Sequence, residues 1–264
     1  MMTRALTVST ILSGAVAAFL GTPALRAQDT PDVGAIVDEA ERRVSGYGDF
    51  TARLTMTLRD GAGSERTRVM QISGLEVPED GDKTLVVFEE PRDLQGTAVL
   101  TVTHREAASE QWLHLPAARR TRRIASGSRT DSFLGSEFTY EDMGSQDLRR
   151  YRYRYLRREA LAGRDMHVLE RVPLDGDSGY SRHLVWLDTE EYRVFRIDYF
   201  DLNGEPTKSL NVDGYERYAG GQWRPTRMVM ADLGSRGSTT LHWTDYAFGT
   251  GLDDSDFDSR RLGR

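Results

Sequence analysis

The segment Phe50–Ser73, FTARLTMTLRDGAGSERTRVMQIS, gives the clearest indication of the fold class. Apolar side chains occupy alternate positions from Phe50 to Leu58, and threonine or arginine fills the positions between them. A two-residue repeat places one set of side chains on a buried face of a β-strand and the other on a solvated face. The turn sequence Asp60–Gly63 then leads into a second strand near Arg66–Ser73, so the segment predicts an antiparallel hairpin.

The same pattern continues through most of the chain. Short runs of alternating residues are separated by turn sequences such as Asn203-Gly204 and Gly220-Gly221. Short connections between successive strands indicate hairpins, so we predict a mainly β protein with α. Its core is a single strongly curved antiparallel sheet of about a dozen strands, an incomplete β-barrel. Further strands are expected at 84–90, 97–104, 111–115, 119–125, 151–158, 165–172, 180–188, 193–201, 207–218, 222–231 and 239–248.

One helix is expected before the first strand. Asp29 or Thr30 can cap a helix that begins at Pro31 and ends before Gly46. Its apolar residues follow a 3.6-residue period and form one stripe, which we expect to lie on the concave side of the sheet. They are Val33, Ile36, Val37, Ala40 and Val44. A helix and a loop that cover a concave apolar face leave a cavity beneath them, a common site for an apolar ligand.

The N-terminus has the pattern of a secretory signal peptide. Arg4 precedes the apolar segment Ala5–Leu20, and Ala24–Ala27 offers a cleavage site before Gln28. We therefore predict a signal peptide at 1–27 and one periplasmic domain at 28–264. No later segment approaches the roughly 20 apolar residues that span a bilayer.

Composition narrows the function classes. The chain has no cysteine, which excludes disulfides and a cysteine-linked lipid anchor, and its formal net charge is −6, which argues against nucleic acid as the main partner. Its five histidines lack helical ligand spacing, and Ser136 lies outside a G-x-S-x-G motif. The alternation Tyr151–Tyr155 indicates a strand with aromatic rings inward and arginines outward. We therefore predict neither catalysis nor a metal or other cofactor.

A cationic cluster and an apolar loop stand out in the segment Trp112–Met143. Cations beside apolar rings suit an amphipathic ligand, such as a lipid with an anionic head group. The cluster can face such a head group or an acidic partner surface. It can also pair with Asp131, Glu137, Glu141 and Asp142, and we expect at least two of the arginines to do so. The cluster comprises Arg119, Arg120, Arg122 and Arg123.

The predicted lipid cavity combines inward-facing strand residues with apolar residues of the loop. The strand residues are Leu54, Met56, Leu100, Trp112 and Trp186. The loop residues, which would form part of a plug or lid, are Phe133, Leu134, Phe138 and Tyr140.

Three blocks of the sequence resemble those of the LolA-like outer-membrane lipoprotein-sorting proteins, in the branch often found beside genes for RND-type transporters. They are the LQGT sequence from Leu94 with Leu100-Thr101, the WLxLPxxRRxRRI pattern from Trp112, and the FLGSxFxYxD pattern from Phe133. Lys208, Trp223-x-Pro225 and the strand with Met228 and Met230 also fit.

The resemblance covers nearly all of residues 28–264, and it implies a helix-capped incomplete β-barrel in the periplasm. Such a protein shields a lipid or lipoprotein acyl chain between an inner-membrane RND-type transporter and an outer-membrane acceptor. It would be a monomer that touches membranes only transiently. Two alternatives stay open: an accessory protein of an RND-type transporter that carries no cargo, and an unrecognised periplasmic hydrolase.

Overall fold

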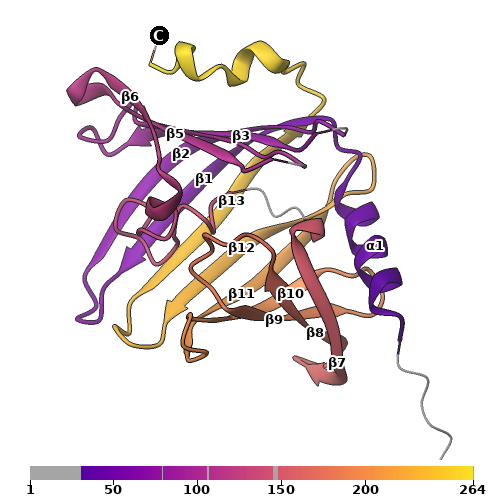
Figure 1. Ribbon diagram of the computed structural model, residues 1–264. Helices are drawn as coiled ribbons and strands as arrows, with labels where there is room; N and C mark the ends of the chain where they lie inside the picture. The colour runs from indigo at the N-terminus through magenta and orange to yellow at the C-terminus, as the bar shows by residue number, and fades with distance from the viewer. Residues whose placement is uncertain (1–30, 79, 106, 145–147, 264) are drawn as a thin grey trace, which may run out of the picture. The chain divides into compact units, whose positions relative to one another are not determined.

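The computed structural model describes residues 31–263 except 79, 106 and 145–147. Residues 31–264 form one compact unit (Figure 1). The predicted signal peptide at 1–27 and the candidate helix caps Asp29 and Thr30 lie outside the described residues. No helix in the described part of the chain is long and apolar enough to cross a membrane.

A single 13-stranded sheet dominates the fold, and every neighbouring pair of strands is antiparallel, as predicted. The strands are β1 Asp49–Arg59, β2 Glu65–Leu75, β3 Lys83–Glu90, β4 Ala98–Val102, β5 Glu110–Leu115, β6 Arg120–Arg123, β7 Tyr151–Leu161, β8 Arg164–Pro173, β9 Arg182–Asp188, β10 Val194–Phe200, β11 Pro206–Arg217, β12 Trp223–Asp232 and β13 Ser238–Phe248. The helices are α1 Val33–Val44 and the short 3-10 helices η1 Pro116–Ala118, η2 Ser126–Ser128, η3 Leu148–Arg150, η4 Asp254–Phe257 and η5 Ser259–Arg261.

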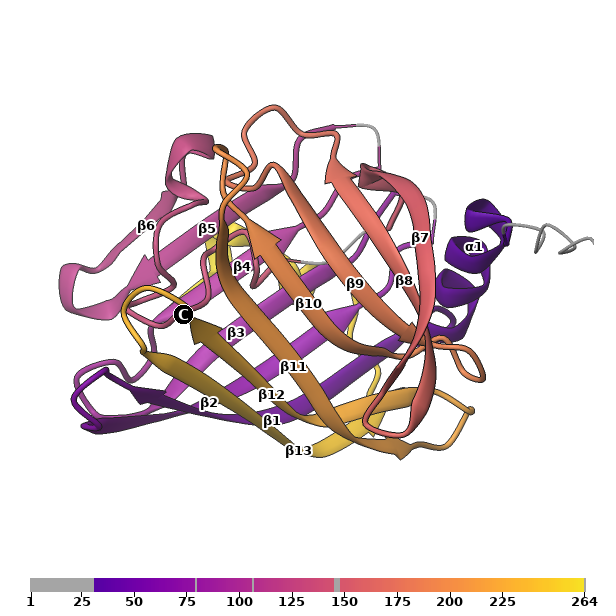
Figure 2. The same ribbon diagram turned by 90° about the horizontal axis from the view of Figure 1, so that it is seen from below.

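The strand order shows where the sheet stays open. It runs from β6 through β1, continues into β13, and descends to β7. The first and last strands of the chain, β1 and β13, are therefore paired with each other. The two strands at the edges of the sheet, β6 and β7, are consecutive in sequence. Figure 2 shows the sheet curving round with these two strands on opposite sides of it. The segment that links β6 to β7 must cross the open side.

Alternation in β1 follows the prediction closely. Ala52, Leu54, Met56 and Leu58 are buried, and the residues between them are half-buried. Leu54, Met56 and Leu58 belong to the main apolar cluster, which also includes residues of the β6–β7 segment and of α1. The cluster therefore fills the concave side of the sheet, and the expectation of an apolar concave face is confirmed.

Helix α1 lies at one end of this concave face. Ile36 and Ala40 are buried in the main cluster, and the helix contacts β7. Asp32 is the N-cap, because its Oδ1 accepts a hydrogen bond from the Gly34 backbone nitrogen at 2.9 Å. The helix thus begins two residues later than predicted, and Asp32 caps it in place of Asp29 or Thr30.

The convex face carries two separate apolar clusters, and this corrects the cavity prediction. Leu100 and Trp112 pack with Phe257 and Leu262, from the C-terminal segment that covers β3–β5. Trp186 belongs to another outer cluster, with Met166 and Val168. These three predicted cavity residues therefore lie on the opposite face of the sheet from the concave side.

Candidate functional site

Residues 124–144, in the segment between β6 and β7, fold inward as a plug. Phe133 is fully buried, and its ring lies 6.0 Å from the ring of Phe88 on β3 and 5.4 Å from that of Tyr140. A tight turn closes the loop, since the Phe133 nitrogen donates to the Phe138 carbonyl at 2.7 Å. Leu134, with a positive φ of 50°, packs against the same cluster. The predicted plug loop is therefore part of the core.

Two apolar chambers remain between the covers and the concave face. The helix chamber, of about 390 Å³, lies between α1 and strands β7–β12. The loop chamber, of about 320 Å³, lies between the plug and strands β1–β3 and β10–β13. They share a wall made of Phe50, Val194, Tyr215 and Met228. Each chamber is at the lower end of the size range of ligand pockets, about 300–1,000 Å³, and the two adjoin.

The chambers only partly match the predicted cavity residues. Phe138 lines the loop chamber. Leu54, Met56, Phe133, Leu134 and Tyr140 pack in the main cluster on the same side of the sheet but do not line either chamber. None of the predicted cavity residues lines the helix chamber, whose wall includes Tyr215, Trp223 and Met228 instead. The signal for Trp223 and Met228 was present, because both belong to the blocks that carry the family resemblance.

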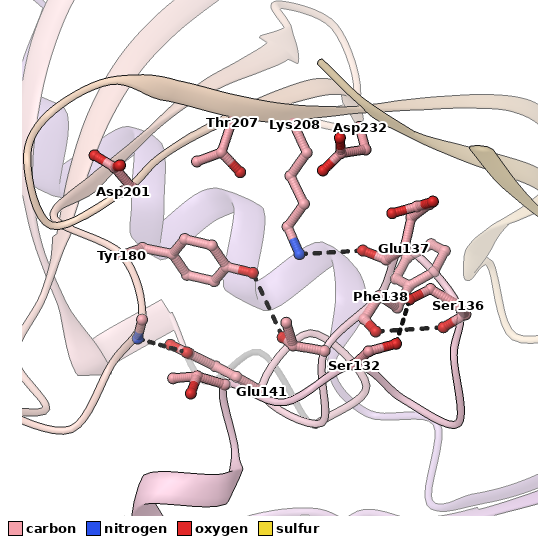
Figure 3. Close-up of a pocket in the computed structure, with 13 residues that line it drawn as sticks. Ser132, Ser136, Glu137, Phe138, Glu141, Tyr180, Asp201, Thr207, Lys208 and Asp232 are labelled. Carbon is pink, nitrogen blue, oxygen red and sulfur yellow. Dashed lines mark hydrogen bonds between the residues drawn. The ribbon is translucent and has the colours of Figure 1, made fainter. Parts of the chain in front are cut away.

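A buried ion pair fixes the plug to the sheet. Lys208 Nζ on β11 donates to Asp142 Oδ2 at 2.6 Å, and the two side chains are only 6% and 3% exposed. The same nitrogen reaches the Glu137 carbonyl at 3.2 Å, and the Tyr180 hydroxyl donates to Asp142 Oδ1 at 3.0 Å. Lys208 and Tyr180 also line a polar pocket of about 320 Å³, in which Figure 3 shows the Lys208 amine directed at the Glu137 carbonyl.

Further polar groups continue this network beneath the plug. Arg171 Nε donates to His183 Nδ1 at 3.2 Å, and its guanidinium lies 4.3 Å from the centre of the Tyr151 ring. Burial, with the neighbouring cations Arg171 and Lys208, lowers the pKa of His183 to about 2. His183 is therefore neutral near pH 7 and can accept the Arg171 hydrogen bond.

The described carboxylates of the plug form no ion pair with the arginine cluster. Glu141 accepts hydrogen bonds from Ser178 Oγ at 2.6 Å and from the Gly179 nitrogen at 2.9 Å, and burial raises its pKa. Asp142 pairs with Lys208 instead. Because the plug turns inward, it carries these acids away from the edge strand. The predicted pairing of at least two cluster arginines with them is wrong.

The arginine cluster lies on and beside β6, an edge strand. All four arginines are exposed. Arg123 pairs with Glu110 at 2.7 Å, and its guanidinium lies 5.9 Å from the centre of the Trp112 ring. Among the described residues no carboxylate forms an ion pair with Arg119, Arg120 or Arg122. Charged side chains on an edge strand hinder pairing with other chains, which gives the cluster a structural role in addition to any binding role.

Ser136 Oγ contacts the Phe138 carbonyl at 3.3 Å, so its hydroxyl is engaged within the plug. No group of three or more His, Cys, Asp or Glu residues among those described is placed to hold a metal ion. The aromatic residues of β7 lie half-buried and its arginines are exposed, as the alternation predicted. Tyr153 lines the helix chamber.

Comparison with known proteins agrees with this architecture. A family model described as “uncharacterized protein” matches residues 80–264. A domain from Vibrio parahaemolyticus, described as an outer membrane lipoprotein-sorting protein domain, is 40% identical, with a TM-score of 0.85 over 87% of this chain and 97% of that one. A DUF1329 family protein from Desulfovibrio piger is 29% identical, with a TM-score of 0.82 over 87% of this chain and 98% of that one.

A LolA superfamily protein from Nitrosomonas europaea shares the fold. It is 21% identical, with a TM-score of 0.70 over 85% of this chain and 96% of that one. A comparison with curated proteins found no match. The open 13-stranded sheet, the inward plug and the 40% identity to the Vibrio parahaemolyticus domain lead to one assignment. The chain belongs to the LolA-like family of outer-membrane lipoprotein-sorting proteins.

Proposed function

We propose that this protein is a periplasmic carrier that shields the acyl chain of a lipid or lipoprotein on its way towards the outer membrane. The observation that supports this most directly is the pair of adjoining apolar chambers beneath α1 and the plug. Chambers of this kind remove a hydrocarbon chain from water, and the driving force is roughly proportional to the apolar area buried.

The proposal includes the location and the partners. Residues 1–27 would act as a signal peptide and residues 28–264 as the carrier domain. An inner-membrane transporter of the RND type would load the cargo, and an outer-membrane acceptor would receive it. The exposed arginines beside and on β6 suit an anionic membrane surface or an acidic partner, since charge complementarity mainly accelerates encounter.

Native mass spectrometry of protein purified from its own periplasm tests the proposal. We expect a copurified ligand with the mass of a lipid or acylated peptide. A protein that forms a stable complex with a transporter, but stays empty and binds no fatty-acid probe, would instead be an accessory subunit. Hydrolytic turnover lost in Ser136→Ala would identify an enzyme.

A matched pair of variants tests whether the chambers bind the cargo. Met228 forms part of the wall that both chambers share, whereas the next residue, Val229, lines neither chamber. Both side chains are half-buried. Met228→Glu should weaken binding of a fluorescent fatty acid at least tenfold, because an unpaired charge in an apolar site costs several kcal/mol. Val229→Glu should bind normally, and equal losses in the two variants would contradict the assignment.

A further inference from the structure

The lining of the helix chamber includes charged side chains among its apolar residues, and two of its polar groups lie together at the start of β12. Trp223 and Arg224, at the start of β12, both line it. The indole nitrogen of Trp223 is buried and has no hydrogen-bond partner among the described residues. A buried N–H without an acceptor costs about 1–3 kcal/mol, so such a donor indicates a missing acceptor.

Arg224 presents a cation at the same position. Its Nη1 donates to the Trp223 carbonyl and its Nη2 to the Val44 carbonyl, both at 3.2 Å. The guanidinium also lies over the ring of Tyr47, 5.2 Å from its centre. No carboxylate of the described residues forms an ion pair with it. Burial lowers the pKa of Arg224, although an arginine stays charged at neutral pH.

The nearest acids are engaged elsewhere. Both carboxylate oxygens of Glu76 accept hydrogen bonds from the Gly46 nitrogen, at 2.8 and 3.0 Å, and one also accepts from the Gly48 nitrogen at 3.1 Å. Asp82 is hydrogen-bonded to Tyr47. Arg224 therefore differs from Arg43 and Arg193, two other arginines of the chamber, which pair with Glu191 and Asp188. The fourth chamber arginine, Arg171, donates to His183 and lies against the Tyr151 ring.

The loop chamber also contains a buried indole nitrogen that lacks an acceptor among the described residues. Trp243 lines it, and the indole nitrogen of Trp243 is also buried without a hydrogen-bond partner among the described residues. A pure hydrocarbon would leave both indole N–H groups unsatisfied. The occupant that fits both chambers has oxygen acceptors as well as an apolar tail.

From these observations we propose that the cargo is an acidic amphiphile, and that Arg224 and the Trp223 indole bind its carboxylate or phosphate head group. The inference rests on the proposed carrier function and names its class of cargo. Arg224 supplies charge-assisted hydrogen bonds and Trp223 a neutral one, while the tail lies along the shared wall towards the loop chamber. Neutral amphiphiles of equal length lose the charged contact but keep the burial of the tail.

Four amphiphiles of equal chain length test the proposal by calorimetry on the full chain: palmitate, hexadecyl phosphate, methyl palmitate and hexadecanol. The wild type should bind one or both acids on the order of tenfold more tightly than hexadecanol. Inorganic phosphate alone should not compete at matched concentration, which separates a lipid head group from a free anion. Whichever acid binds more tightly identifies the head group.

Variants of β12 test whether Arg224 and Trp223 cause the preference for acidic amphiphiles. Arg224→Gln keeps a donor for the Val44 carbonyl but removes the charge, so it should abolish the preference for acids and leave hexadecanol binding unchanged. Arg224→Lys should restore most of that preference, and Trp223→Phe should weaken acid binding about fivefold. Arg227→Gln is the matched control, because Arg227 is exposed and pairs with Asp213 at 2.7 Å.

The outcomes separate the two proposals. If the wild type binds none of the four amphiphiles, the carrier function itself fails. If it binds acids and hexadecanol equally, or if Arg224→Gln and Arg227→Gln behave alike, the carrier function stands and the acidic head-group site is wrong. Melting temperatures of all variants show whether the fold is kept, and Trp223→Phe gives an independent result if Arg224→Gln fails to fold.

Discussion

The plug and helix α1 cover the same concave face but are attached to it differently. The plug is held by a buried ion pair between Lys208 and Asp142, with side chains 6% and 3% exposed. Helix α1 is held by Ile36 and Ala40 in the core and by ion pairs at the surface, such as Arg149 with Glu41, where the arginine is 45% exposed. Exposed pairs contribute about 0–1 kcal/mol, whereas breaking a buried pair costs about 3–5 kcal/mol. The plug is therefore the fixed cover, and α1 is the cover that can be displaced at lower cost.

The largest loss of stability is expected when the buried ion pair between Lys208 and Asp142 is broken. Lys208→Met leaves the Asp142 carboxylate buried without its cation, and it should lower the free energy of unfolding by about 3–5 kcal/mol. Urea denaturation measures this. Arg227→Gln, at an exposed pair, should cost only about 0–1 kcal/mol. The double variant Lys208→Met/Asp142→Leu should recover much of the loss, and a double variant as unstable as the single one would show that the ion pair does not hold the plug.

The second effect concerns the pH dependence of the network beneath the plug. The folded pKa of His183 lies well below the usual value of 6.5, so only the unfolded state takes up the proton as the pH falls below about 6.5. Its contribution is present above that pH and is lost progressively below it. The loss should be about 1.4 kcal/mol between pH 7.5 and 5.5.

The variant His183→Gln isolates this contribution, because glutamine does not titrate and still offers Arg171 an acceptor. Its stability should fall less than that of the wild type over the same pH range. Glu141, whose pKa is raised by burial, titrates in both proteins and cancels in the difference. The exposed His242 provides a control substitution, His242→Gln. Identical pH profiles for wild type and His183→Gln would mean that His183 is not held neutral.

A smaller effect on stability is expected when the attachment of helix α1 is weakened. Arg43 links α1 to Glu191, at the turn before β10. Arg43→Gln should change stability by no more than about 1 kcal/mol but raise the dissociation rate of a bound fatty-acid probe about twofold to fivefold. Arg42→Gln is the control, since Arg42 forms its ion pair within the helix, with Glu39. Stopped-flow fluorescence measures both rates, and unchanged release in Arg43→Gln would argue against α1 as the displaceable cover.

The smallest effect on stability is expected outside both covers, on the edge strand. The double variant Arg120→Gln/Arg122→Gln removes exposed charges that form no ion pair with any described residue, so the unfolding free energy should stay within about 0.5 kcal/mol. Transfer of a probe from anionic vesicles should slow, and the effect should shrink as salt is added. A large fall in melting temperature with normal transfer would mean that these arginines are structural.

Local patterns predicted the sheet well but could not identify which face is concave. Alternation located the strands because one face of most strands is more buried than the other. In β4, however, Val99 and Leu100 are both buried, on opposite faces. The C-terminal segment with Phe257 and Leu262 covers the outer face there, and no pattern within β4 reveals a cover so distant in sequence.

The predicted ion pairs failed for a related reason. Proximity in sequence brought the arginine cluster and Asp142 together in the prediction, but the plug turns inward and Asp142 meets Lys208 on β11. Such a pairing depends on the curvature of the whole sheet. The residues of the helix chamber likewise come from segments far apart in the chain, so only the family resemblance drew attention to Trp223 and Met228.

The pairing of β1 with β13 has a consequence for folding. Every other adjacency in the sheet joins strands that follow one another in the chain, so β1–β6 and β7–β13 can each form as a meander from local hairpins. The β1–β13 ladder, from Phe50 opposite Phe248 to Arg59 opposite Ser238, must then join two halves separated by almost the whole domain. Closing so long a loop costs entropy before any contact compensates for it, and non-local pairing slows folding. The joining of the two meanders is therefore expected to be the slow step, and until it is complete the apolar faces of both halves stay open to aggregation.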